Sequence, residues 1–450
     1  MNPFRNHAEK ILQHALEAVN PRTLLRAQVR LNGSRLCLAD EILEMKAIGR
    51  ILVVGAGKGV APMASELEAI LTNHLAGGVV IVKKGHALPL KRIEAIEAGH
   101  PIPDSESRNG TVRLLSFLKP LRSNDLVIFL LTGGGSALLE MPADGISWVD
   151  LQDVNHELMA CGASISEVNT IRKHLSQVKG GQMLRFLAPA RVITLAVSDV
   201  IGDAPNEIAS GPTVPDPTTY FDAWRVVEKY HLQIRLPGSI IEHLQRGMEG
   251  QIPETLKPGD ESTASSAFKV IGNNRLMLRA AQESAVEFGY RSWILTDRMS
   301  GEAAAMGRRL AALMKNLQNL WRTTQENRCL IIGGETTVTL RCEGKGGRNQ
   351  ELALAAAVEL SGTPDCLLMS IGSDGSDGPT DAAGAVVDGD TLRRAKEKGL
   401  DAADSLLKND SYSFFKNLGD LIMTGPTMTN VMDLVLLFIG KPHSAIGGSR

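Results

Sequence analysis

The sequence lacks several features that mark whole classes of protein. Its five cysteines are widely spaced and form no CxxC pair, which argues against a cysteine zinc site and for a reducing compartment. No uninterrupted apolar run approaches the roughly 18 residues that a membrane-spanning helix needs. The formal net charge of −2 gives no electrostatic footprint for nucleic acid or an anionic membrane. We therefore expect a cytoplasmic protein that binds neither nucleic acid nor membrane.

Familiar targeting and catalytic motifs are missing as well. The amino-terminal segment has no continuous apolar core of a signal peptide, and Ile11, Ala15 and Val19 instead predict an amphipathic helix. Nothing fits the phosphate-binding pattern GxxxxGK[ST] or the zinc motif HExxH. The ten histidines are scattered, so we interpret them as surface or core residues.

What is present is an alternation of short β-branched runs with longer helical patterns, which is typical of α/β layers. Buried parallel strands are predicted in the first half at 51–54, 78–82, 126–131 and 192–197, with helices at about 59–73, 104–118 and 147–160. Further strands are predicted at 269–272, 292–295, 330–332, 366–371 and 434–439. We predict a two-domain α/β fold, with domains 1–235 and 236–450 and a polar surface excursion at 247–266.

Two glycine-rich stretches each combine one cation with a predicted helix start. They are GAGKG at 55–59, which contains Lys58, and GKGGRNQE at 344–351, which contains Arg348. Backbone N–H groups at a helix N-terminus stabilise a phosphate or a carboxylate. Lysine is a mobile point charge suited to phosphate, and arginine is a planar fork suited to carboxylate or phosphate. Two such stretches predict a cleft for a small polyanion, although a tight turn with a solvated lysine is the alternative for the first.

The loop TGGGSALL at 132–139 follows a predicted strand. Its three consecutive glycines before Ser136 provide backbone N–H groups that can converge on an anion, with a flexible turn as the alternative. The segment 167–183 then carries several cations, and on one helix Arg172 would share a face with Ser176 and Lys173 with Gln177. Lys179 precedes a pair of glycines that separate two helices. A solvated basic face is the alternative interpretation of these charges.

Aspartates recur in two polar loops. Asp199 and Asp203 lie in the long loop after the strand 192–197, and carboxylate oxygens are ligands for a hard divalent cation. Asp374, Asp377 and Asp381 lie within eight residues of one another and could position magnesium or a substrate hydroxyl. Ordinary turns and helix caps are the alternative for all of them.

Taken together, the ordered segments resemble the class II glycerate 2-kinases with a C-terminal MOFRL domain. The segments that carry the resemblance are GAGKG, TGGGSALL, EVNTIRKHLSQVKGG, SDVIGDAPNEIASGPT, GGETTV, GKGGRNQELAL, GSDGSDGPTDAAGA, NDSYSFF and TGPTMTNVMDL. They run in order from Gly55 to Leu434 and so cover nearly the whole chain. The stretch 247–266 and both termini match nothing in the pattern.

The resemblance implies ATP-dependent phosphorylation of D-glycerate at its 2-hydroxyl, which gives 2-phosphoglycerate and ADP. It implies a Rossmann-like three-layer α/β/α first domain, a second α/β domain with the MOFRL region at about 327–440, and an active site in the interdomain cleft. It also implies that Lys58 and Arg348 are the main catalytic pair. The candidates for binding nucleotide, phosphate or substrate are Gly55, Gly57, Gly59, Gly133, Gly134, Gly135, Ser136, Asn169, Arg172, Lys173, Lys179, Ser210, Gly211, Gly334, Glu335, Gly347, Asn349 and Glu351.

Phosphoryl transfer chiefly requires alignment and neutralisation of the charge on the transferring group. We predict that Lys58, with the N–H groups of Gly57 and Gly59, stabilises the γ-phosphoryl of ATP, and that the TGGGS loop is a second cradle. Arg348 clamps either the carboxylate of glycerate or the same phosphoryl. Mg²⁺ on the nucleotide phosphates is held by Asp199 or Asp203, or by Asp374, Asp377 and Asp381, and one of these carboxylates also takes the hydroxyl proton.

Two other functions fit parts of the sequence. An NAD(P)H-dependent hydroxypyruvate reductase would use the same glycine loop, but Val60 replaces the sixth-position glycine of a dinucleotide fingerprint. The strand 78–82 is followed by Lys83 and Lys84 instead of the acid that binds an NAD ribose, which leaves NADP open. A non-catalytic sensor of phosphorylated metabolites would need the anion loops but no magnesium. The sequence does not determine the oligomeric state, and a homodimer is one of the states it allows.

Overall fold

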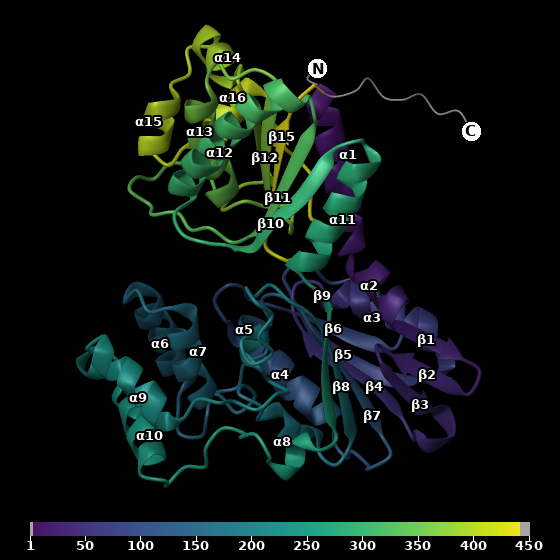
Figure 1. Ribbon diagram of the computed structural model, residues 1–450. Coiled ribbons are helices and arrows are strands. Elements are labelled where there is room, and N and C mark those ends of the chain that lie inside the picture. Colours follow the sequence, from purple (N-terminus) through teal and green to yellow (C-terminus); the bar gives the residue numbers. More distant parts are fainter. Residues whose placement is uncertain (1–2, 442–450) are drawn as a thin grey trace. The chain divides into compact units, whose positions relative to one another are not determined.

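The computed structural model describes residues 3–441, and the chain divides into two compact units (Figure 1). The Rossmann-like unit comprises Pro21–Gly272. The C-terminal unit comprises, of the described residues, 3–20 together with 273–441. The predicted α/β class is confirmed, whereas this division differs from the predicted domains 1–235 and 236–450.

Both differences in the division have a structural cause. Strand β9 (Ser266–Gly272) pairs in parallel with β8 (Arg191–Val197), so the chain stays in the Rossmann-like unit until Gly272. At the other end, helix α1 (Pro3–Ala18) packs beside α11 (Asn274–Glu287) of the C-terminal unit. The predicted apolar stripe of α1 is confirmed, because Ile11, Ala15 and the adjoining Val19 are buried.

The Rossmann-like unit is built on a six-stranded parallel sheet in the order β6-β5-β4-β7-β8-β9. The remaining strands are β4 (Ile51–Ala56), β5 (Leu75–Lys83), β6 (Ile93–Ala98) and β7 (Leu126–Leu131). Strands β4 and β7 are buried along their whole length, as expected of apolar runs covered on both faces. The chain extends the sheet from β4 first in one direction and then, from β7, in the other, so β4 and β7 flank its topological switch point. Open α/β sheets bind ligands at that point.

Helices and a small sheet surround this framework. The helices are α2 (Pro21–Gln28), α3 (Val60–Leu71), α4 (Ser105–Phe117), α5 (Gly135–Leu138), α6 (Trp148–Ala160), α7 (Ile165–His174), α8 (Met183–Leu187), α9 (Tyr220–Lys229) and α10 (Gly238–Met248). Helices α6, α7, α9 and α10 share a separate hydrophobic core and form a helical lobe (Figure 1). Strands β1 (Val29–Asn32), β2 (Arg35–Leu38) and β3 (Glu41–Glu44) form an antiparallel sheet that the sequence did not predict.

The stretch 247–266 is only in part the polar surface excursion that was predicted. Leu256 within it is fully buried and belongs to the core of the parallel sheet. Thr255 is buried as well and donates a hydrogen bond to Asp216. The irregular segment is therefore anchored to the Rossmann-like unit before β9 begins.

The C-terminal unit contains a mixed sheet in the order β10-β11-β15-β12-β13-β14. Its strands are β10 (Arg291–Met299), β11 (Arg328–Gly334), β12 (Cys366–Gly372), β13 (Gly384–Asp388), β14 (Leu421–Ile422) and β15 (Asp433–Ile439). Its other helices are α12 (Ala303–Thr324), α13 (Arg348–Leu360), α14 (Thr391–Glu397), α15 (Ala402–Leu407) and α16 (Ser411–Leu418). Strands β11, β12 and β15 are buried throughout. The alanine-rich helix α13 packs against α12 and β13 in the main core of this unit.

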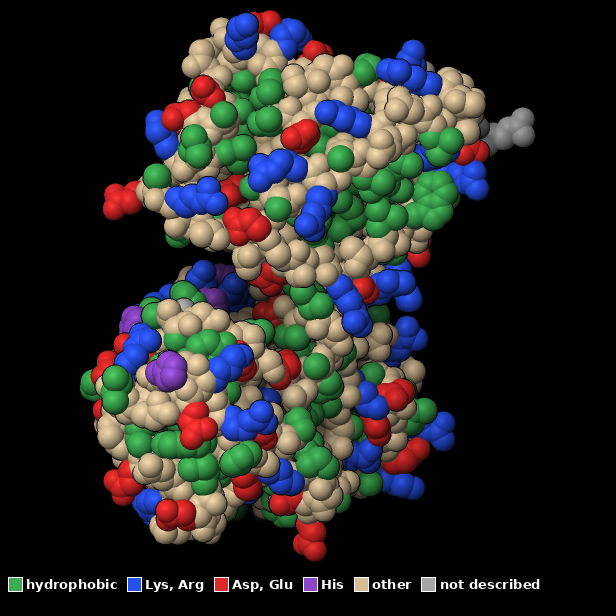
Figure 2. All heavy atoms as spheres, turned by 60° about the vertical axis from the view of Figure 1, so that its left-hand side comes forward, with side chains coloured by type: hydrophobic (Ala, Val, Ile, Leu, Met, Phe, Trp, Pro, Cys, Tyr) green, Lys and Arg blue, Asp and Glu red, His purple; other side chains and the backbone are tan. Residues whose placement is uncertain are grey.

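The surface agrees with the small net charge. On the face that Figure 2 shows, basic and acidic side chains are interspersed over each unit. No helix within residues 3–441 is both long enough and apolar enough to cross a membrane.

Candidate functional site

The loop that contains Lys58 connects β4 to α3 at the switch point of the parallel sheet. It lies against the loop after β7, because a Cβ at Gly57 would be 2.2 Å from Thr132 Oγ1. The N–H of Lys58 donates to Gly133 O at 2.9 Å, and the N–H of Gly59 donates to Thr132 Oγ1 at 2.9 Å. The N–H of Gly57 donates to Ile81 O. The predicted role of the Gly57 and Gly59 amides is therefore wrong for this structure, since protein acceptors occupy them and the loop serves to position Lys58.

Open backbone donors occur instead in the neighbouring loop after β7. Gly134 has a φ of 85° and precedes the short helix α5. Among the described residues, the structure assigns no hydrogen-bond acceptor to the N–H groups of Gly133 and Gly134. A Cβ at Gly134 would be 2.8 Å from His100 and 3.3 Å from Lys58 Cγ. The predicted cradle at 132–136 thus has free amides beside Lys58.

Asp199 completes this group at the end of β8. Burial raises the pKa of the Asp199 carboxyl, and the positive charge of Lys58 opposes that shift. The two side chains therefore interact electrostatically although they come from strands on opposite sides of β7. Asp203, the second aspartate of the loop, has a φ of 56° in the turn that follows.

A chain of hydrogen bonds links the β7 loop to α7. Ser210 Oγ donates to Asn169 Oδ1 at 3.1 Å, and Asn169 Nδ2 donates to Glu207 at 2.8 Å. Because Ser210 has only one hydroxyl proton, Ser136 Oγ is the donor in its 2.7 Å contact with Ser210 Oγ. Gly211 follows in the left-handed conformation with a φ of 59°. The predicted residues Ser136, Asn169 and Ser210 are therefore brought together.

The predicted cations of the segment 167–183 are not on a solvated helix face. Helix α7 ends at His174, so Ser176 and Gln177 do not continue it and the predicted face-sharing is wrong. Lys173 is fully buried and lies 3.4 Å from Asp216. Lys179 is buried and lies 2.5 Å from Glu140. Both lysines therefore form internal ion pairs. Arg172, in contrast, lines a cavity.

Arg348 of the C-terminal unit is held between carboxylates. Its Nε and Nη2 donate to the two oxygens of Asp433 at 2.8 and 2.9 Å, and its Nη1 lies 2.7 Å from Glu335. Burial by itself would lower the pKa of the guanidinium, but the charge and hydrogen bonds of Asp433 raise it. Burial also raises the pKa of Asp433, and Arg348 opposes that shift. The arginine is permanently charged and rigidly oriented.

The anion position at the start of α13 is already occupied by a protein side chain. The carboxylate of Asp377 accepts the N–H groups of Asn349 and Gln350 at 3.1 and 2.9 Å. A Cβ at Gly347 would be 2.3 Å from Asp377 Cγ, so glycine is needed there. Asn349 also accepts from Ser370, which fixes its amide. The helix N-terminus expected to bind substrate is therefore capped from within.

The other predicted residues of this unit have structural partners. Glu351 accepts a hydrogen bond from Asn409, and burial raises the pKa of the Glu351 carboxyl. Gly334, at the end of β11, lies against Met299 with a φ of 130°. Asp381 accepts from Tyr412 Oη at 2.6 Å, and Asp374 accepts from Ser376. Within residues 3–441, no three His, Cys, Asp or Glu side chains are grouped so that they could hold a metal ion, and Mg²⁺ stays a prediction.

The position of Asp377 predicts a pH effect on stability. Burial raises the pKa of its carboxyl from 3.8 to about 6. The folded state then binds this proton more tightly than the unfolded state, so the contribution of Asp377 to stability is full below about pH 4 and is lost as the pH rises through about 6. Across this range of pH, the contribution of Asp377 to the free energy of unfolding changes by about 3 kcal/mol.

We expect Asp377→Asn to reduce the pH dependence of the melting temperature over this window. The exposed Asp390→Asn is the control, and an unchanged pH dependence in Asp377→Asn would contradict the assignment.

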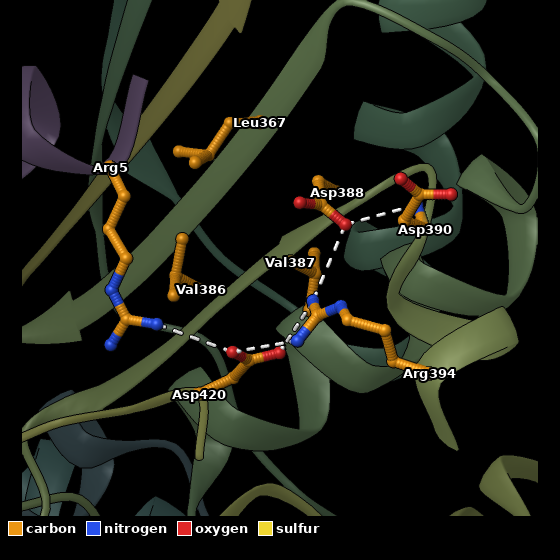
Figure 3. Close-up of a pocket in the computed structure, with 8 residues that line it drawn as sticks. All are labelled: Arg5, Leu367, Val386, Val387, Asp388, Asp390, Arg394 and Asp420. Atoms are coloured by element: carbon orange, nitrogen blue, oxygen red, sulfur yellow. Dashed lines mark hydrogen bonds and ion pairs between the residues drawn. The ribbon is translucent and has the colours of Figure 1, made fainter. Parts of the chain in front are cut away.

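A cavity of about 500 Å³ in the C-terminal unit is lined by two arginines, Arg5 and Arg394, but does not have the features of an anion-binding site (Figure 3). Arg5 and Arg394 both point at Asp420, which lies 3.3 Å from the first and 2.9 Å from the second. Arg394 also contacts Asp388 at 3.4 Å. Both arginines there are paired with aspartates, so this cavity offers an anion no uncompensated positive charge.

A second cavity of about 410 Å³ lies in the Rossmann-like unit above the β7 loop. Its lining includes His100, Gly134, Ser136, Asn155 and Arg172. His100 was not predicted, because the glutamates within β6 interrupt its apolar pattern and the strand that precedes His100 was not recognised. Asn155 was missed because one asparagine within a helix carries no recognisable motif.

Comparisons with known proteins match almost the entire chain. The domain of unknown function DUF4147 matches residues 7–245, and the MOFRL family matches residues 328–433. A glycerate 2-kinase of Pyrococcus horikoshii is 39% identical and covers 96% of both chains. A D-glycerate 2-kinase of Thermotoga maritima is 40% identical and covers 95% of this chain and 97% of its own. A protein of Agrobacterium vitis with the provisional name hydroxypyruvate reductase is 41% identical over 87% of this chain and 88% of its own.

The fold is similar to a solved structure as well. The crystal structure of glycerate kinase from Thermotoga maritima matches with a TM-score of 0.84 and 39% sequence identity. The match covers 97% of this chain and 99% of that one.

Proposed function

The chain belongs to the glycerate 2-kinase family, and from that premise we propose that it transfers the γ-phosphoryl group of ATP to the 2-hydroxyl of D-glycerate. The products are 2-phospho-D-glycerate and ADP. The observation that carries the proposal is the group formed by Lys58, the free amides of Gly133 and Gly134, and Asp199 at the switch point of the parallel sheet. That group contains an anion cradle, a lysine cation and a partly buried carboxylate.

Charge stabilisation is the first requirement of phosphoryl transfer, since charge is spread over the oxygens of the transferring group. The N–H groups of Gly133 and Gly134 bind phosphate oxygens of ATP. Lys58 stabilises the transferring γ-phosphoryl, because the hydrogen bond from its backbone N–H to Gly133 holds this cation next to the amides of the β7 loop. The loop GAGKG therefore acts through its lysine, and the loop TGGGS acts through its backbone.

Proton removal is the second requirement, because the attacking 2-hydroxyl must lose its proton as the bond to phosphorus forms. Asp199 accepts this proton. The raised pKa of this partly buried carboxyl supports the role, since it makes Asp199 a stronger base than an exposed aspartate. The oxygen–phosphorus bond to ADP breaks as the new bond forms, and ADP leaves with the bonding electrons.

Arg348 supplies a second permanent cation from the C-terminal unit. Two of its donors are committed to Asp433 and one to Glu335, so its orientation is set before any ligand binds. We assign it to charge stabilisation during transfer. We assign the clamp on the glycerate carboxylate, the other role predicted for Arg348, to a cation that is not already paired with carboxylates.

Magnesium would be supplied with the nucleotide. Mg²⁺ is usually held by one or two carboxylates together with substrate phosphates, and Asp199 beside the phosphate-binding loop fits that donor set. When bound, the ion would neutralise charge on the nucleotide phosphates. Asp377 and Asp381 fit less well, because hydrogen-bond donors of the protein already engage their oxygens.

Replacing Asp199 separates its two roles. We expect Asp199→Asn to lower kcat by about 10² to 10⁴-fold, which is the usual contribution of a general base. Because the pKa of Asp199 is raised from 3.8, wild-type kcat falls as the pH drops through that raised value, so its acid limb lies above pH 3.8. The variant should lack this limb. A normal limb combined with a higher Mg²⁺ requirement would make Asp199 a metal ligand and not the base.

The proposed reaction is tested against hydroxypyruvate reduction by offering both substrate pairs to the purified protein. We expect ADP formation that depends on D-glycerate and Mg²⁺, and no oxidation of NADH or NADPH by hydroxypyruvate. ATP with Mg²⁺ should raise the melting temperature, because a ligand stabilises the folded protein that binds it. Cofactor oxidation without ADP formation would overturn the kinase assignment.

A further inference from the structure

Arg172 is half-buried and, unlike the buried Lys173 and Lys179, has no carboxylate hydrogen-bonded to it among the described residues. Its Nε donates to Asn155 Oδ1 at 2.7 Å, and Asn155 Nδ2 is itself fixed by Leu151 O at 2.9 Å. The structure assigns no acceptor among the described residues to Nη1 or Nη2 of Arg172. Burial lowers the pKa of this guanidinium, and the negative charge of Glu140 opposes that shift only in part. A fixed arginine with two open donor groups is suited to an oxyanion.

The surrounding charges leave the positive charge of Arg172 unbalanced. Glu140 is the nearby acid whose charge acts on Arg172, but its Oε2 is bound to Lys179 at 2.5 Å and its Oε1 to Ser176 at 2.8 Å. One carboxylate thus faces two cations. Arg348 presents the opposite case, because two carboxylates hold one arginine.

The cavity that Arg172 lines also presents a hydroxyl acceptor. The only proton of Ser136 Oγ is directed to Ser210, so Ser136 can accept a hydrogen bond but has none to donate. Arg172 and Ser136 line the same cavity of about 410 Å³. The cavity thus offers the donors of Arg172 for a carboxylate and the acceptor Ser136 Oγ for a hydroxyl group. This combination fits a molecule that carries both groups.

We infer that Arg172, oriented by Asn155, binds the carboxylate of the 2-hydroxy acid substrate and thereby determines the specificity of the reaction for acids. This inference rests on the proposed kinase function. Asn155 is a positioning residue, since it contacts the Nε of Arg172 and leaves the two terminal amino groups to the substrate.

A nucleotide phosphate is the other source of an oxyanion, and two observations favour the carboxylate. The planar guanidinium fork matches the two coplanar oxygens of a carboxylate. Ser136 as an acceptor requires a donor on the ligand, which a substrate hydroxyl provides and a phosphate ionised at neutral pH does not. The open amides of Gly133 and Gly134 already give the phosphates a separate place.

The test compares the Michaelis constants for D-glycerate and for ATP in variants of Arg172 and Asn155. We expect Arg172→Ala to raise KM for D-glycerate roughly 10- to 100-fold, the usual cost of losing charged hydrogen bonds, while KM for ATP changes less than about twofold. Arg172→Lys keeps the charge without the fork and should lie between. Asn155→Asp keeps the acceptor for Nε but neutralises Arg172, and it should raise KM for D-glycerate as well.

Matched controls separate binding from folding. Arg225 is exposed on α9 of the same lobe, so Arg225→Ala should leave both constants unchanged. With glyceramide, which has no carboxylate, wild type and Arg172→Ala should give similar kcat/KM values. Without ATP, D-glycerate should raise the melting temperature of the wild type and not that of Arg172→Ala.

Other kinetic results would overturn either the assignment of Arg172 or the proposed function. A rise in KM for ATP instead of D-glycerate would overturn the inference in favour of a phosphate subsite. Unchanged constants for both substrates in a folded Arg172→Ala would also overturn it. Failure of the wild type to phosphorylate D-glycerate would instead refute the proposed function itself, before any variant is compared.

Discussion

Lys58→Ala is expected to lower kcat for phosphoryl transfer by about 10³-fold or more, in line with the effect of other cations that stabilise a transferring phosphoryl. The backbone of the glycine loop cannot replace the lysine, because the N–H groups of Gly57 and Gly59 donate to protein acceptors. The melting temperature should change little, since Lys58 lies at the end of a strand and is only partly buried. Steady-state kinetics with ATP, Mg²⁺ and D-glycerate measures the effect.

Lys84→Ala is the matched control for this variant. Lys84 follows the neighbouring strand β5, its side chain is 62% exposed, and its partner is Asp104 at 2.7 Å. Its removal should change kcat less than about twofold, as expected for an exposed ion pair. If Lys58→Ala retained more than a tenth of wild-type kcat, Lys58 would not stabilise the transferring group.

Arg348→Ala is expected to lose both turnover and stability. Asp433 is 0% exposed and would be left as an unpaired buried charge, which typically costs about 3 to 5 kcal/mol. We therefore expect a clear fall in the melting temperature of Arg348→Ala. The exposed Arg393→Ala, which removes only surface ion pairs, should leave the melting temperature nearly unchanged.

A double replacement distinguishes the stabilising role of Arg348 from its catalytic role. Arg348→Met combined with Asp433→Leu removes both charges of the buried pair, and apolar replacements of such pairs are often neutral or stabilising. The double variant should regain most of the lost melting temperature and remain without kinase activity. Recovery of turnover together with stability would show that Arg348 serves the fold alone.

The fold could be predicted from sequence where burial is continuous along an element. Strands β4 and β7 were predicted because each is an unbroken apolar run, as expected of a strand in a parallel sheet that is covered on both faces. Strand β6 was missed, because Glu94 and Glu97 interrupt its apolar residues near the edge of the sheet. The transfer of α1 to the C-terminal unit depends on packing with residues more than 250 positions away, such as Tyr290, and no local pattern records that contact.

The candidate site was predictable only to the level of residue type. The sequence indicated Lys58 and the glycines of the β7 loop, and their placement at the switch point agrees with that prediction. It could not show that the Gly59 amide is occupied by Thr132, because loop-to-loop hydrogen bonds are long-range. The same holds for Asp377 at the start of α13, whose carboxylate fills an N-terminus that the sequence left for a ligand.

The most direct test of the account is phosphorus NMR of the purified protein with ATP, Mg²⁺ and D-glycerate. We expect a 2-phosphoglycerate resonance to grow as ADP appears, and we expect it to be absent with Lys58→Ala. A 3-phosphoglycerate resonance would contradict the assigned hydroxyl while leaving the phosphoryl transfer intact. If no phosphoglycerate forms while the wild type is folded and ATP remains unconsumed, the central claim is refuted.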